Sequence, residues 1–254
     1  MTISTRVWKN YVNGLSEVSE KAKALTLEYL EEHTIDTYEE RQAFILFCYG
    51  ISAKYGEAAA TFACQMYDAE AAYEGVLLDP AEPAEPASYG EVAKTVNGTL
   101  KQLLAAEITA AAIGRLVKRC GQDTTLKNAI RDYALIAWIP MGDTCAFCLS
   151  IAAEGWKRAT QKALAGGHAE HIHGNCDCAY AVKHNEETDY SAYNPDKYEN
   201  IMDSADGTTQ NEKLNSIRRM AYQENKDRIN AQKRSAYEKR KELNDSQAEE
   251  IDVN

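Results

Sequence analysis

Apolar residues spaced three or four positions apart limit the fold of this chain more than any other feature. Between Ser4 and about Glu32 they form one seam, which consists of Trp8, Tyr11, Leu15, Val18, Ala22, Leu25 and Tyr29. This spacing is the period of an α-helix with a single apolar side. The seam suits a short coiled coil with a partner subunit, but Gly14 weakens its middle, and we expect it to pack within its own chain.

Two capping boxes predict where the next helices begin. Thr37 precedes Glu40, and Ser88 precedes Glu91, at the spacing at which a hydroxyl and a carboxylate satisfy each other's backbone N–H groups. The helix that follows Thr37 is almost wholly apolar, and we expect it to break near Gly56.

Helix-breaking residues predict where the later elements end. We expect the helix after Ser88 to end at Cys120-Gly121, and a further helix from Leu126 to Trp138, where Pro140 stops it. A short strand is expected over residues 179–182. A third capping box, Thr209 to Glu212, predicts a long charged helix that reaches about Leu243.

These patterns predict a mainly α fold with a small irregular Cys/His module. Residues 1–78 are expected to form an N-terminal helical region and residues 79–88, which hold three of the five prolines, a semi-rigid linker. Residues 89–140 are expected to be helical and 141–184 to form the Cys/His module. A linker over 185–207 and a basic helical arm with an acidic tail over 208–254 complete the division.

Composition argues against a disordered chain and against a membrane-spanning one. Hydrophobic residues make up 44% of the chain, which suffices for a core. No apolar run approaches the roughly 20 residues that a bilayer requires, and the first residues lack the apolar stretch of a secretory signal. We therefore expect a protein of the cytoplasm, or one packaged there.

Charge is concentrated in one segment, called the basic arm below. From Lys213 to Lys241 ten basic residues stand against three acidic ones, so the arm carries +7 and the rest of the chain carries −18. A basic-Ala-Tyr unit recurs fifteen residues apart in the arm, around Tyr222 and Tyr237. Such an arm neutralises phosphates, docks on an acidic protein surface, or is a solvated charged helix. The candidate binding residues are Arg218, Arg219, Lys226, Arg228, Lys233, Arg234, Lys239 and Arg240.

Cysteine spacing predicts a structural zinc site. Cys145-x2-Cys148 directs two thiolates at one point, and a second group of ligands follows about two dozen residues later. The candidate ligands are Cys145, Cys148, His173, Cys176 and Cys178, one more than a tetrahedral site requires. Reduced packing cysteines and an oxidised pair are the alternatives.

Two further histidines give no specific catalytic motif. His168-Ala169-Glu170 matches half of a zinc deaminase motif, but the halves stand in the wrong order. A zinc-supported nuclease would require a second-ion site for which no partner pair stands in the expected order. We expect His168 and His171 to lie in a solvated loop, and we assign no catalytic residue.

Around these residues the sequence resembles the minor head proteins of tailed bacteriophages, the Mu F-like head morphogenesis group of phages and prophages of Gram-positive bacteria. The resemblance covers the second half of the chain. It rests on Trp138 to Trp156, Gly167 to Cys178, Asn194 to Tyr198, Ile217 to Arg219 and Lys226 to Arg234.

The resemblance implies a low-copy structural protein that joins the prohead near the portal vertex and acts in head morphogenesis, DNA packaging or ejection. It implies a place inside the capsid, after assembly in the host cytoplasm. The implied partners are the phage portal protein and/or the major capsid protein, with packaged DNA as a sequence-independent partner and no membrane. No enzyme activity is implied. Two alternatives stay open: a metal-dependent nuclease or hydrolase, and a zinc-containing DNA-binding regulator.

Overall fold

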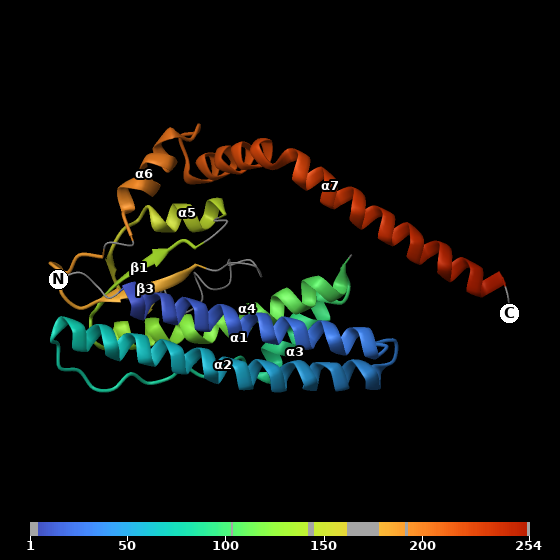
Figure 1. Ribbon diagram of the computed structural model, residues 1–254, viewed down its shortest axis with the longest axis horizontal. Helices are drawn as coiled ribbons and strands as arrows, with labels where there is room; N and C mark the ends of the chain where they lie inside the picture. Colours follow the sequence, from blue (N-terminus) through green and yellow to red (C-terminus); the bar gives the residue numbers. More distant parts are fainter. Residues whose placement is uncertain (1–4, 103, 142–144, 162–177, 191–192, 253–254) are drawn as a thin grey trace. The chain divides into compact units, whose positions relative to one another are not determined.

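The computed structural model describes residues 5–102, 104–141, 145–161, 178–190 and 193–252. The chain forms two compact units, residues 1–199 and 200–254. Helices dominate both units (Figure 1), so the predicted mainly α fold is confirmed. In the part of the chain that is described, no helix is long and apolar enough to cross a membrane.

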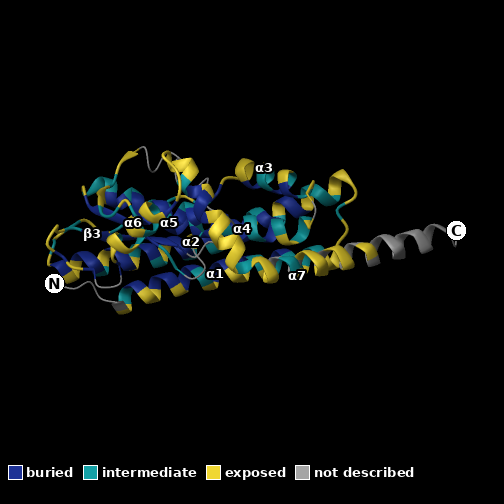
Figure 2. Cartoon of the chain, turned by 90° about the horizontal axis from the view of Figure 1, so that it is seen from above, coloured by how far each residue is buried: buried dark blue, intermediate teal, exposed yellow. Residues whose placement is uncertain are grey.

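Three long helices form the centre of the first unit. Helices α1 (Thr5–Glu32) and α2 (Tyr38–Glu74) lie side by side and antiparallel, and α4 (Ala105–Arg131) packs against both (Figure 1). The shorter α3 (Tyr89–Thr99) packs on α2 and α4. Buried residues gather on the sides where these helices face one another (Figure 2).

The apolar seam of α1 packs within its own chain, as expected. Trp8, Tyr11 and Leu15 are buried in the core that α1 forms with α2 and α4. A Cβ added at Gly14 would lie 2.8 Å from the Phe62 ring of α2. This glycine therefore allows α1 and α2 to approach closely.

Both capping boxes of the first unit are confirmed. The Glu40 carboxylate accepts from the Thr37 N–H at 2.9 Å, and the Thr37 hydroxyl accepts from the Glu40 N–H at 3.2 Å. The second box is present at the start of α3. The break predicted near Gly56 is wrong, because α2 continues through it. A Cβ at Gly56 would lie 3.2 Å from Pro86 Cβ, so this glycine makes room for the proline-rich segment.

That segment, Asp79–Ala87, is called the strap, and it lies along α4. Asn128 Nδ2 donates to the Glu82 carbonyl at 2.8 Å, and Asn128 Oδ1 accepts from the Glu82 N–H at 2.9 Å. The Thr124 hydroxyl accepts from the Ala84 N–H at 2.9 Å. Side chains of α4 therefore fix the strap through its backbone.

Helix α4 corrects two predictions. The end expected at Cys120-Gly121 is wrong, because α4 continues without a break to Arg131. The helix expected from Leu126 to Trp138 is wrong in its second half, because Leu135–Ile139 forms strand β1. A run of apolar residues this short fits a buried strand as well as a buried helix.

A Schellman-type turn separates α4 from β1. The Ala134 N–H donates to the Ala129 carbonyl at 2.9 Å, and Tyr133 takes the left-handed conformation with φ 55°. Glycine usually occupies that position, so a tyrosine there gives the sequence no recognisable stop signal.

A small antiparallel sheet completes the first unit. Its strand order is β2 (Lys157–Arg158), β1 (Leu135–Ile139), β3 (Ala179–Lys183). In the pairing of β1 with β3, Leu135 lies opposite Lys183 and Ile139 lies opposite Ala179. All residues of both strands are buried, and helix α5 (Ala146–Ala152) packs on β1. The predicted strand at 179–182 is confirmed.

The second unit consists mainly of helix α7 (Gln210–Asp252). The predicted capping box is confirmed, since Glu212 accepts from the Thr209 N–H at 2.9 Å and Thr209 Oγ1 accepts from the Glu212 N–H at 3.3 Å. The long charged helix continues past its predicted end near Leu243. The stretch 185–207 contains α6 (Pro195–Ser204), which lies at the boundary between the units.

Candidate metal centre and basic arm

Cys145 and Cys148 lie at the start of α5. Cys145 is the N-cap residue, and its Sγ accepts from the Cys148 N–H at 3.4 Å. Backbone donors of this kind favour the thiolate form of a cysteine, which is the form that binds metal. The Cys148 side chain is fully buried, while Cys145 is partly exposed.

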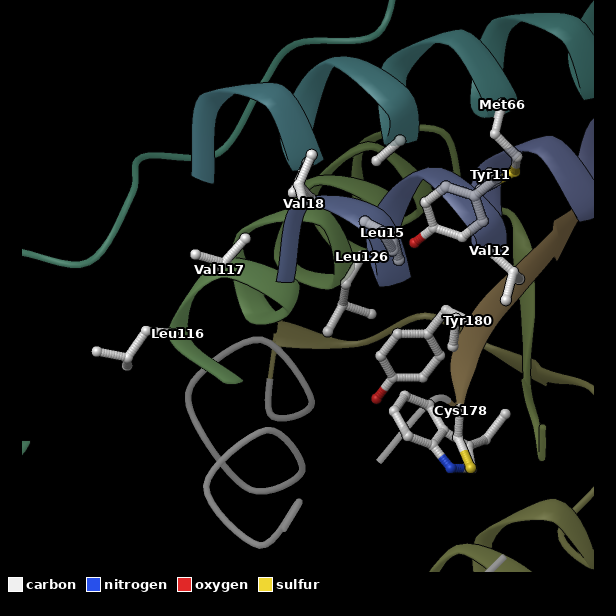
Figure 3. Close-up of a cluster of buried hydrophobic side chains, with 14 of the residues drawn as sticks. Tyr11, Val12, Leu15, Val18, Met66, Leu116, Val117, Leu126, Cys178 and Tyr180 are labelled. Carbon is white, nitrogen blue, oxygen red and sulfur yellow. The ribbon is translucent and has the colours of Figure 1, made fainter. Parts of the chain in front are cut away.

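Cys178 lies at one end of the β1–β3 pair. It immediately precedes β3, and the first residue of β3, Ala179, lies opposite Ile139, the last residue of β1. The chain leaves β1 there and reaches Cys145 six residues later. Cys178 is 2% exposed and lies beside Tyr180 in the core (Figure 3). The strand register therefore places Cys178 at the end of the β1–β3 pair from which the chain continues toward Cys145.

The remaining predicted ligands, His173 and Cys176, lie outside the described residues, as do His168 and His171. Among the residues that are described, no group of three or more His, Cys, Asp or Glu side chains is placed to hold a metal ion. A closed four-ligand site in this region would therefore take at most two ligands from the described residues and the others from outside them, with His173 and Cys176 as the candidates. The zinc site stays a prediction.

The isolated cysteines have a packing role where they are buried. Burial raises the pKa of both the Cys48 and the Cys120 thiol to about 12. Cys120 Sγ donates to the Ala84 carbonyl of the strap at 3.4 Å. Cys64 is partly exposed, and burial raises its pKa as well. Cys48, Cys64 and Cys120 form no disulfide with another described residue.

Sequence reasoning missed a pair of buried acids near the end of α2. The Glu74 carboxylate accepts from the His184 N–H at 2.9 Å, the Asn185 N–H at 2.7 Å and the Thr188 hydroxyl at 2.9 Å. It therefore fixes the turn after β3 to α2. Two glutamates one helical turn apart in an apolar helix are the only sequence signal of this contact.

The second acid, Glu70, is 1% exposed and its carboxyl oxygens have no hydrogen-bond partner among the described residues. Burial, with a smaller contribution from the charge of Glu74, raises the pKa of Glu70 to about 8. Glu70 is therefore neutral at neutral pH. Because it is enclosed in the core, it is in no position to act on a bound substrate.

An open pocket of about 500 Å³ lies between α1 and α2. Its lining consists of Val7, Asn10, Tyr11, Asn13, Gly14, Glu17, Phe62, Gln65, Met66 and Ala69. Glu17 pairs with Lys21 at 2.7 Å, and this pair lowers the pKa of Glu17. The titratable side chains in this lining are Tyr11 and Glu17.

The basic arm lies on α7, and its candidate residues are exposed where their side chains are described. These are Arg218, Arg219, Lys226, Arg228, Lys233 and Arg234. Arg218 donates to Asn215 Oδ1 at 2.9 Å, and the Lys233 ammonium lies 5.8 Å from the centroid of the Tyr222 ring. The side chains of Lys239 and Arg240 lie outside the description.

A family model described as VG15 protein matches residues 2–205. The chain therefore belongs to the VG15 protein family, a family of viral, phage-type gene products. The match includes the helical core, the sheet and the cysteine module, and it ends before α7. No curated protein and no solved structure matches the chain.

Proposed function

We propose that this protein is a structural minor head protein of a tailed bacteriophage. The observation that carries the proposal is the family match over residues 2–205, which assigns the chain to phage gene products. The resemblance of its second half to minor head proteins supplies the finer role. We assign it a portal-proximal place inside the capsid, contacts with the portal or major capsid protein, and a part in head morphogenesis and DNA packaging or ejection.

The zinc site belongs to this proposal as a structural element. Zinc bound by four of the candidate ligands Cys145, Cys148, His173, Cys176 and Cys178 would link the two chain segments of the module. Such a link stabilises a module with few apolar residues of its own. No catalytic step is assigned to the metal.

The test is deletion of the gene from the producing phage, with complementation in trans. Without the chain we expect few infectious particles and few DNA-filled heads, and the wild-type chain should restore both. Electron microscopy of lysates and plaque counts measure the two quantities. Normal yields of filled, infectious particles without the chain would contradict an essential head role.

A matched complementation separates the structural role from the enzyme alternative. His171→Ala, which removes a predicted loop histidine, should complement as well as wild type. Failure of His171→Ala in a folded chain, together with metal-dependent DNA cleavage by purified wild-type protein, would favour the nuclease alternative instead.

A further inference from the structure

The charges of α7 are sorted onto separate sides of the helix. At about 100° per residue, Arg218, Arg219, Lys226, Lys233, Arg234 and Lys241 fall within an arc of about 160°. The acidic residues between positions 218 and 241 are Glu224, Asp227 and Glu238, and they fall within the neighbouring arc of about 60°. The arm therefore presents one side that is cationic and free of acidic residues.

This side, called the donor face, consists mainly of residues whose side chains can donate hydrogen bonds. Besides the six cations it contains Tyr222, Gln223, Asn230 and Tyr237, and the same spacing places Arg240, Ile229 and Ala236 within its arc. The contact between Lys233 and the Tyr222 ring, at 5.8 Å, joins two members of the face across three helical turns. Lys, Arg, Tyr, Asn and Gln are the side chains that bind phosphate oxygens in protein–DNA complexes.

The dimensions of the donor face suit a DNA backbone. From Arg218 to Lys241 the helix rises about 35 Å, which is close to one turn of B-DNA. Cations recur along it at 218/219, 226, 233/234 and 241, or about every 11 Å. The cations are spread evenly along the face, with no central cluster. This matches the uniform charge of a DNA backbone.

An acidic protein surface fits the donor face less well. Protein interfaces are built around a fully buried apolar centre from which lysine is depleted. The donor face contains three lysines, Lys226, Lys233 and Lys241, while Ile229 and Ala236 are the only aliphatic residues that fall within its arc. Its two tyrosines carry hydroxyl groups that donate to phosphate as readily as they pack against a protein.

We propose that the donor face of α7 binds the phosphate backbone of DNA without reading its sequence. The inference rests on the proposed function only in its setting, a particle that contains DNA. The contact itself follows from the charge and donor pattern of the helix.

The test compares two variants of the full chain that change net charge equally. Lys226→Gln/Lys233→Gln alters the donor face, whereas Ala231→Glu/Ser235→Glu alters the opposite side. Both pairs lie between positions 226 and 235 of α7, and each lowers the net charge by two. Binding to two short duplexes of unrelated sequence is measured by fluorescence anisotropy from about 50 to about 300 mM salt.

We expect the wild-type chain to bind both duplexes equally and more weakly as salt rises. The donor-face variant should bind several-fold more weakly, and its slope of log affinity against log salt should be shallower by about 2. The control variant should stay within about twofold of wild type with an unchanged slope. Circular dichroism verifies that all three chains are equally helical.

Three results would overturn the inference: equal losses in the two variants, no DNA binding by wild type at the lowest salt, or equally tight binding to polyglutamate. The last result would indicate an acidic protein partner. Failure here is distinguishable from failure of the proposed function. If filled heads require the chain but the chain does not bind DNA, only the DNA contact is refuted. If the chain binds DNA but phage assembly does not require it, only the head role is refuted.

Discussion

Two glycines of the long helices stand in opposite surroundings. A Cβ at Gly121 would lie 2.6 Å from Leu15 Cδ2 and 3.0 Å from the backbone oxygen of Ala59, whereas a Cβ at Gly50 would meet nothing within 4 Å. Gly121→Ala should therefore destabilise the protein by about 1–3 kcal/mol, because backbone does not yield easily. Gly50→Ala should stabilise it by about 0.5–1 kcal/mol, because alanine restricts the unfolded chain.

Urea unfolding of the two glycine variants measures this difference. The replacement is the same and both positions are helical, so the change in helix propensity is matched. Changes of the same sign in the free energy of unfolding of both variants would contradict the close packing of α1 on α4.

Glu70 makes the stability of the first unit depend on pH. Its pKa is raised to about 8 in the folded protein, above its usual value of 4.5, so the folded state retains a proton that the unfolded state loses. The stabilisation from this proton is fully present below the unfolded pKa. It is lost as pH rises toward 8, because folding must then take up a proton.

Glu70→Gln removes that titration. We expect the free energy of unfolding of the variant to increase relative to that of wild type as pH rises from 5 to 8. At pH 8 it should be larger by about 1–3 kcal/mol. Urea unfolding at several pH values measures the gap. Glu74→Gln is the control and should be less stable than wild type, because Glu74 accepts three backbone or hydroxyl donors with its charge. Parallel pH curves for wild type and Glu70→Gln would refute the account of Glu70.

At the scale of elements, the helix starts that have a capping box were predictable, whereas no helix begins at Leu126 or ends at Cys120-Gly121. In the boxes at Thr37, Ser88 and Thr209, a hydroxyl and a carboxylate satisfy the backbone through local geometry alone. The turn after α4 has no such signal, since Tyr133 takes the left-handed conformation and Arg158 of β2 donates to its carbonyl. Gly56 serves a contact with Pro86, thirty residues away, which no local pattern reveals.

The candidate metal centre stays a prediction from spacing, which gives the candidate ligands Cys145, Cys148, His173, Cys176 and Cys178. The position of Cys178 depends on the pairing of β1 with β3, and β1 was expected to be helical. The buried acids Glu70 and Glu74 escaped prediction because a glutamate in a helix is ordinarily taken as a solvent-facing residue.

Zinc content tests the module directly. The chain purified under reducing conditions should contain about one zinc ion per molecule, and Cys145→Ser/Cys148→Ser should contain almost none. A chelator should lower the thermal midpoint of wild type and leave that of the double variant unchanged, because only wild type has metal to lose. Elemental analysis and thermal scans provide both measurements.

Cys64→Ser is the matched control for the zinc experiment. Cys64 lies on α2, is partly exposed, and is separate from the predicted ligands, so this variant should retain its zinc. Zinc-free wild-type protein would mean that the module cysteines are packing thiols. His173→Ala and Cys176→Ser, assayed the same way, test the two candidate ligands that lie outside the described residues.

At the scale of the whole molecule, the acidic and basic parts of the chain have separate roles in our account. The residues outside the arm carry −18, so they repel DNA and restrict binding to the arm, which carries +7. The family match covers residues 2–205 and leaves out α7. In the proposed function, the matched part supplies the role in the phage head, and the arm adds a contact of its own.

The measurement that tests the central claim most directly is quantitative mass spectrometry of purified, DNA-filled particles. The copy number of this chain is compared with that of the most abundant shell protein and of the portal protein. A minor head protein should be present in every preparation, in far fewer copies than the shell protein and in a constant ratio to the portal protein. Complete absence from filled particles, with the portal protein present, would contradict a structural role in the head.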